Sequence, residues 1–417
     1  MVTTRQTAGG LDLLHLAVFG GYAGQQILTP VLPPLARELS INEFQYGMVM
    51  SASAAVVALV SPVWGRRADV WGRKPLMVMA LFGASLGLLA FAVSAHLGLR
   101  GVLGTVPVFV LLLLARGILF GGSLAALPVA AQAYVADTSV GDEERVKGIS
   151  RVGAAVGLAL VLGPGLGGLL GDLGLLPALY TAPALIGLVG LLVWARLPAE
   201  QVRSGRGGVA GRLSPADPRI RSLLLVGAGI YLSTSLLQTS IGFLLMDRLD
   251  LDAARTVELS GMVLLAGGLP MLLVQGVLIP KLAWRPQRLL LVGVPLTTVA
   301  FAAICLADSL PFFLAAVTLS GFGHSFAIPG YNSALSLSVG PGEQGRAAGL
   351  SASANAVTLV LGPLAATSLY QLDPALPFAV GAVALGVLFL GLLLRRTPAP
   401  AAAPGAAEPA PAADGTR

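Results

Sequence analysis

The sequence predicts an all-α membrane protein with twelve transmembrane helices, arranged as two pseudo-symmetric bundles of six. Its composition, its pattern of apolar runs and a weak internal repeat lead to this fold class. Of the 417 residues, 55% are apolar and only 11% are charged, whereas soluble domains carry about a quarter charged residues. A soluble core cannot hide so much apolar surface, so the chain needs lipid around it.

The apolar residues fall into twelve runs separated by short polar breaks, and each run is long enough to cross a bilayer as a tilted helix. The runs cover residues 11–33, 45–64, 75–95, 108–134, 148–170, 178–195, 222–245, 258–280, 288–306, 311–337, 347–370 and 375–394.

The basic residues predict the orientation of these helices. An even number of helices places both termini on one side, and most Arg and Lys residues fall in the loops of that side, whereas Arg37, Arg100, Arg248 and Arg255 fall on the other. Cytoplasmic loops retain basic residues, so both termini should be cytoplasmic. We attribute the net charge of +6 to membrane topology and to contact with anionic lipid, so we expect no nucleic-acid partner. An Arg-rich, Lys-poor composition is typical of proteins encoded by GC-rich bacterial genes, so we expect this membrane protein in a bacterial inner membrane.

A weak repeat indicates two similar halves. Residues 145–148 (Arg-x-x-Gly) lead into 161–164 (Val-Leu-Gly-Pro), and residues 346–349 and 360–363 repeat both patterns in the second half. Such repeats underlie many transporters, which bind substrate near the midplane where the halves meet. The predicted division is 1–196 for the first bundle, 197–221 for a cytoplasmic linker, 222–396 for the second bundle and 397–417 for a disordered tail.

The strongest motif follows the second apolar run, at Gly65-Arg-Arg-Ala-Asp69-Val-Trp-Gly72-Arg73-Lys74. This pattern, G-x-x-x-D-x-x-G-R-K, resembles the loop motif of the major facilitator superfamily. Glycines permit a tight turn, and Asp69 can cap a helix start and pair with Arg73. The resemblance implies that these residues latch the cytoplasmic side. The alternative is a basic loop that only sets topology.

Two proline motifs resemble the twelve-helix drug:proton antiporter branch of that superfamily. Helix one ends in Pro30-Val31-Leu32-Pro33, and helix five carries residues 163–168, Gly-Pro-Gly-Leu-Gly-Gly. Pro164 removes a helix hydrogen bond and bends the helix, while Gly163, Gly167 and Gly168 let a neighbour approach. The resemblance implies a hinge associated with export; the alternative is ordinary helix packing.

Arg116 stands deep in the fourth apolar run, where an arginine costs roughly 2.5–3.5 kcal/mol on insertion scales. It should therefore face a polar cavity, or snorkel toward the outer surface. Its place resembles the helix-four arginine motif of the family. The glycine expected four residues on is Phe120, however, and the next glycine is Gly121, which leaves the register of that motif open.

The proton carrier is the least determined feature. The acidic residues nearest the apolar runs lie at helix ends, so no carboxylate stands in the middle of the membrane. His324, midway along the tenth run, titrates near neutral pH and is the first candidate, with a neutral hydrogen-bonding role as the alternative. Asp12 is the second candidate, with helix capping as the alternative.

The superfamily resemblance implies that helices one, four, seven and ten line the substrate cavity, although each polar side chain in them could instead join helices. The candidates for the lining are Gln25, Gln26, Arg116, Tyr231, Gln238, His324 and Asn332.

The remaining motifs exclude enzymatic chemistry. We find no phosphate loop, metal-ligand cluster or nucleophile triad, and one cysteine, Cys305, cannot form an intramolecular disulfide or a cysteine zinc site. We expect no metal and no cofactor. The predicted function is proton-coupled efflux of small amphipathic or drug-like molecules by alternating access, and the resemblance implies that the protein works as a monomer. Metabolite uptake or facilitated diffusion, and a non-transporting receptor on the same scaffold, remain alternatives.

Overall fold

The computed structural model describes residues 2–139, 142–197, 213–340 and 343–394. Most of the predicted linker (198–212) and the whole predicted tail (397–417) lie outside the described residues. Within the described ranges every regular element is a helix.

The first half of the chain forms ten helical elements: α1 (Val2–Ile27), α2 (Leu32–Glu38), α3 (Glu43–Trp71), α4 (Arg73–Leu99), α5 (Thr105–Leu112), η1 (Leu113–Phe120), α6 (Gly121–Leu124), α7 (Ala126–Thr138), α8 (Asp142–Gly171) and α9 (Leu175–Arg196). The second half forms α10 (Arg221–Leu249), α11 (Ala253–Leu273), η2 (Val274–Leu278), α12 (Ile279–Leu282), α13 (Pro286–Leu306), α14 (Leu310–Leu337), α15 (Gln344–Leu372) and α16 (Leu376–Leu394).

Eleven stretches of the described chain are long and apolar enough to cross a membrane. Two of them combine several elements, since α5 to α7 form one stretch (Thr105–Thr138) and α11 to α12 another (Ala253–Leu282). The 26-residue helix α1 is long enough as well, but Asp12, His15 and its three glutamines make it less apolar. The predicted all-α membrane fold is confirmed.

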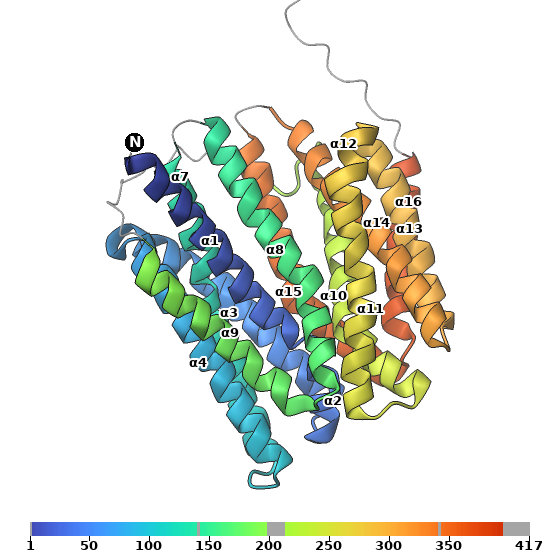
Figure 1. Cartoon of the computed structure of the whole chain (residues 1–417). Coiled ribbons are helices and arrows are strands. Elements are labelled where there is room, and N and C mark those ends of the chain that lie inside the picture. Colours follow the sequence, from blue (N-terminus) through green and yellow to red (C-terminus); the bar gives the residue numbers. More distant parts are fainter. Residues whose placement is uncertain (1, 140–141, 198–212, 341–342, 395–417) are drawn as a thin grey trace, which may run out of the picture.

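The long helices stand side by side, and α1 begins at the same end of the molecule at which α16 finishes (Figure 1). We call this end the terminal face and the opposite end, where α2 lies, the α2 face. The two halves of the chain meet where α8 packs on α11, where α3 packs on α15, and where α2 packs on α10 and α11.

The halves are in direct contact near the α2 face. A Cβ on Gly261 of α11 would lie 2.4 Å from the Cα of Gly168 in α8, and a Cβ on Gly242 of α10 would lie 2.7 Å from Pro33 of α2. A Cβ on Gly47 of α3 would lie 2.2 Å from the hydroxyl of Thr367 in α15. The missing side chains thus let opposite halves touch at three places.

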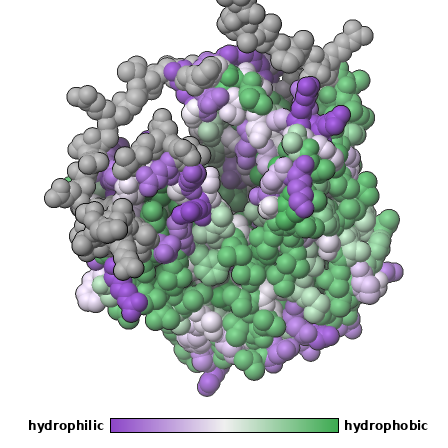
Figure 2. Space-filling model, turned by 45° about the horizontal axis from the view of Figure 1, so that its top comes forward, coloured by the Kyte–Doolittle hydropathy of each residue, from purple (hydrophilic) through white to green (hydrophobic). Residues whose placement is uncertain are grey.

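The terminal face, in contrast, is hollowed between the two halves, and hydrophilic side chains rim the hollow above the apolar belt (Figure 2). An apolar cleft also opens between α3 and α15, lined by Ala58, Ala356, Val357, Val360 and Leu361. The structure is therefore closed at the α2 face and open toward the terminal face.

The first helix ends earlier than predicted. Helix α1 finishes at Ile27, Pro30 lies in the following turn, and Pro33 belongs to the separate short helix α2. Two prolines fit the first turn of α2 because the N–H groups there have no partner within the helix. The prediction that helix one runs to residue 33 is wrong for this reason.

Candidate transport site

The predicted latch motif is mostly helical. Helix α3 runs to Trp71, and only Gly72 separates it from α4, with φ of 86° in the left-handed region that favours glycine. Gly65 lies inside α3 with open space around it, so the tight-turn prediction is right for Gly72 and wrong for Gly65. Asp69 caps no helix start, because Gly72 holds the cap position of α4 without a side-chain hydrogen bond.

Arg73 joins three helices of the first half. Its side chain is only 5% exposed, Nη1 lies 2.9 Å from Oδ1 of Asp69, and Nε lies 2.8 Å from Oδ2 of Asp137 in α7. The predicted pair of Arg73 with Asp69 is present, but Asp137 is the better buried partner, with 13% of its side chain exposed against 66% for Asp69. Lys74 is half-buried beside this cluster. The cluster lies within the first half, so it ties α3, α4 and α7 together.

Arg116 lies in the π-helix η1 and is 2% exposed. Its guanidinium carbon is 4.9 Å from the centre of the Phe120 ring, and its Nε and Nη1 have no hydrogen-bond partner among the described residues. Snorkelling to the surface is thereby excluded. A π-helix bonds residue i to residue i+5, whereas an α-helix bonds residues that are four apart. In η1 the residue one turn after Arg116 is therefore Gly121, which takes the position at which the helix-four arginine motif has a glycine. Gly121 uses this place to pack on Ser53 of α3.

The glycines of α8 pack against both halves. Gly163 faces the Cβ of Gln26 in α1, Gly167 faces the carbonyl of Ile27, and Gly168 faces Gly261 of α11. Helix α8 continues unbroken through Pro164. Close packing is thus observed at these positions, while a hinge remains a proposal.

Side chains of α1 and α10 differ in burial along the predicted cavity. Gln26 is buried, and Gln25, Gln238 and Tyr231 are half-buried. Asp12 is exposed and lies ten residues after the start of α1, so the capping alternative for it is wrong.

Tyr231 and Asn332 are brought close by α10, α14 and α15. The Tyr231 ring stands edge-on to that of Tyr331, with centroids 6.1 Å apart, and the hydroxyl of Ser351 lies 3.5 Å from Oδ1 of Asn332. Asn332 itself is exposed. The sequence predicted Tyr231 and Asn332 as cavity residues and indicated Tyr331 as an inward-facing polar residue, but it gave no signal for Ser351, because serine is common in helix interiors.

His324 lies between α10, α13 and its own helix. Nε2 is 2.9 Å from the hydroxyl of Ser233, Nδ1 is 2.9 Å from the carbonyl of Ser320, and the ring stands 6.3 Å from that of Phe301. A carbonyl only accepts, so Nδ1 carries a hydrogen. The structure thus places His324 inside the second bundle, and its hydrogen bonds go to Ser233 and Ser320, not to Tyr231 or Asn332.

Sequence reasoning missed a cluster on the α2 face. Nη2 of Arg37 in α2 lies 2.8 Å from Glu43 of α3 and 3.1 Å from Oδ2 of Asp247 in α10. The hydroxyl of Tyr370 in α15 donates to the same Oδ2 at 2.6 Å. Arg37 and Asp247 are 210 positions apart in the chain, so no local pattern relates them.

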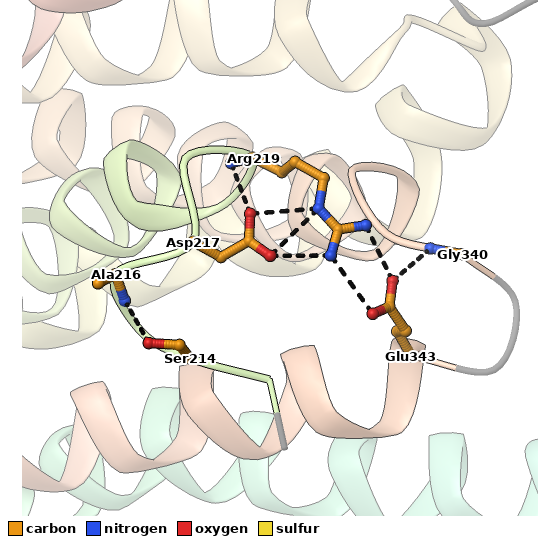
Figure 3. A network of polar contacts seen from close by, with 6 residues as sticks. All are labelled: Ser214, Ala216, Asp217, Arg219, Gly340 and Glu343. Atoms are coloured by element: carbon orange, nitrogen blue, oxygen red, sulfur yellow. Dashed lines mark hydrogen bonds and ion pairs between the residues drawn. The ribbon is translucent and has the colours of Figure 1, made fainter. Parts of the chain in front are cut away.

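A second charged network lies near the terminal face, between the segment before α10 and the loop before α15 (Figure 3). Arg219 Nη2 is 2.8 Å from Asp217, and its Nη1 is 3.0 Å from Glu343. The guanidinium lowers the pKa of both carboxyl groups. The network fastens the described end of the predicted linker to the second half.

Comparison with known proteins decides the family of this fold. The model of the Major Facilitator Superfamily matches residues 14–310 and 284–415. The chain belongs to the Major Facilitator Superfamily. It is therefore a multi-pass membrane transporter and no enzyme, which confirms the predicted family and sets aside the receptor alternative.

Similar sequences of this superfamily cover most of the chain. The chain is 27% identical over 361 residues to the class G tetracycline resistance protein of Vibrio anguillarum, covering 84% of this chain and 87% of that protein. It is 25% identical over 382 residues to multidrug resistance protein 1 of Bacillus subtilis (strain 168), covering 90% and 94%.

Among solved structures, a bacterial homolog of the human lysosomal transporter Spinster, in an inward-facing and occupied conformation, has a TM-score of 0.70. Its sequence identity is 16%, and the match covers 92% of this chain and 95% of that chain. At this identity the likeness shows the fold.

Proposed function

We propose that this transporter exports small amphipathic or drug-like molecules across a bacterial inner membrane, with both termini in the cytoplasm, driven by inward proton flow. The observation that carries the proposal is the similarity, over 84% and 90% of the chain, to proteins named for tetracycline and multidrug resistance. The side with most of the basic residues is the terminal face, which suits a cytoplasmic orientation.

In this scheme the structure is the state that takes up substrate from the cytoplasm. The hollow of the terminal face admits the molecule, and the exposed Asn332 with the neighbouring Tyr231 is the first polar surface it meets in the second half. Gln25, Gln26, Arg116 and Gln238 complete the proposed cavity. The first bundle then rocks against the second around this site, while α8 flexes at its glycines and Pro164.

The proposed proton carrier is His324, with Asp12 as the second candidate. The hydroxyl of Ser233 donates to the carbonyl of Ile230 at 2.8 Å, which leaves its oxygen free to accept from Nε2 of a charged His324 ring. Nδ1 keeps its carbonyl acceptor in either charge state. The ring can therefore gain a second proton at Nε2 without losing a hydrogen bond.

The test measures internal pH in proteoliposomes on addition of tetracycline, cationic dyes and small metabolites. We expect proton movement that depends on substrate, and its loss in His324→Ala or in Asp12→Asn. His96→Ala is the matched control, because His96 pairs with Tyr180 near the far end of α4.

Facilitated diffusion or uptake is the second candidate, favoured by the lack of a carboxylate in the middle of any described span. Substrate flux without proton movement would refute proton coupling and favour this alternative. Flux toward the terminal face in a gradient-driven assay would refute export.

A further inference from the structure

The α2 face is closed by side chains from both halves. Arg37, Glu43 and Tyr46 come from α2 and α3, and Phe243, Asp247 and Tyr370 come from α10 and α15. Oδ2 of Asp247 receives hydrogen bonds from Arg37 of one half and from Tyr370 of the other. Through this oxygen, Arg37 of the first half is joined to Asp247 and Tyr370 of the second half.

Aromatic rings lie beneath these charges. Phe243 is fully buried, and its ring centre lies 5.3 Å from that of Tyr46 across the boundary between the halves and 5.7 Å from that of Tyr370. The guanidinium carbon of Arg37 lies 5.6 Å from the Phe243 ring centre. The rings keep water out, and the ion pairs stand on the solvent side of them, with 29% of the Asp247 side chain exposed.

We infer that these six residues form the gate of the α2 face, and that Asp247 in its ionised form holds the gate closed. This inference rests on the alternating access of the proposed function. Charged hydrogen bonds are roughly twice as strong as neutral ones, and an amide in place of the Asp247 carboxylate would form no ion pair with the guanidinium of Arg37.

The charged residues near Asp247 do not replace it in holding the two halves together. Arg37 also pairs with Glu43 of its own half, which keeps the guanidinium in place when the two halves part. Arg248, the next residue of α10, turns instead to the carbonyl of Cys305 at 3.4 Å. The pair of Arg255 with Glu258 lies on the same face but within α11, so it joins nothing across the boundary.

The experiment measures opening of the gate and does not depend on substrate transport. Thr367→Cys in a Cys305→Ser background places one thiol at a fully buried position against Gly47 of the other half. The rate at which a bulky maleimide labels this thiol in nanodiscs reports separation of the halves at the α2 face.

We expect Asp247→Asn to raise the labelling rate about tenfold, the order of one lost charged hydrogen bond. Tyr370→Phe should raise it less. The exchange of Arg37→Asp with Asp247→Arg should bring the rate back toward that of the parent. Arg255→Gln is the matched control and should leave it unchanged.

Equal rates for Asp247→Asn and the parent, or an equal rise in Arg255→Gln, would each overturn the inference. If Asp247→Asn is labelled faster than the parent but the parent moves no substrate, the proposed function is refuted and the assignment of the gate holds.

Discussion

The contact of α8 with α11 leads to a prediction whose size follows from the structure. A Cβ on Gly261 would lie 2.4 Å from Cα of Gly168 and 2.7 Å from its N, whereas carbon atoms in contact prefer about 3.5–4.0 Å. In Gly261→Ala the two helices must therefore separate by about 1 Å. Such overpacking costs about 1–3 kcal/mol. Because the helices belong to opposite halves, the cost falls on the state closed at the α2 face.

A cost of this size shifts an equilibrium between two states about 5- to 150-fold. We expect Gly261→Ala to raise maleimide labelling of the Thr367→Cys reporter by a factor in this range. Gly153→Ala, in the same helix α8 as Gly168 but with no neighbour within 4 Å, controls for the higher helix propensity of alanine. Identical labelling rates and unfolding midpoints in the two variants would refute the argument that α8 and α11 touch here.

Three further predictions concern buried and paired charges. Arg116→Met should raise the free energy of unfolding by roughly 1–4 kcal/mol and abolish transport, because an unpaired buried charge is replaced by an apolar chain; a lower unfolding midpoint would contradict this. Asp137→Asn should lower the unfolding free energy by about 1.5–3 kcal/mol, against less than about 1 kcal/mol for the exposed Asp69→Asn, although the latter should still cripple turnover; equal midpoints would argue against Asp137 as the main partner. Arg219 lowers the pKa of two carboxyl groups from ordinary values of 3.8 and 4.5, so the stability it adds is present above those values and disappears as pH falls through the lowered ones. The unfolding midpoints of the parent and Arg219→Gln should converge in that acidic range, and a constant difference would contradict the assignment.

The sequence was sufficient for the fold class because hydropathy in a membrane protein directly reflects which segments face lipid. The family motif was also readable, and its Asp69–Arg73 pair is only four residues apart in the chain, on either side of the turn at Gly72. The end of helix one was predicted wrongly, since apolar residues continue through the turn after Ile27 and into α2. Hydropathy does not distinguish one long helix from a helix, a turn and a second short helix.

Partners distant in the chain were beyond the sequence. Asp137 and Asp247 were visible only as acids at helix ends, and nothing local relates them to Arg73 or to Arg37. His324 was predicted from its depth in a helix, but depth does not fix which side of the helix faces the cavity. Its contacts with Ser233 and Ser320 depend on how α10 and α14 are rotated, which packing decides.

The π-helix at residues 113–120 has a consequence for how this chain tolerates insertions and deletions. A π-helix holds about one residue more per turn than an α-helix. It can therefore take up a single added residue while the helical segments on both sides keep the same faces toward their neighbours. A second such segment, Val274–Leu278, lies in the stretch formed by α11 to α12. Removing one residue from either segment should restore α-helical bonding and turn the helix beyond it little, whereas the same deletion in a regular helix rotates everything beyond it by about 100°. Single-residue length variation among related transporters should therefore concentrate in these two segments.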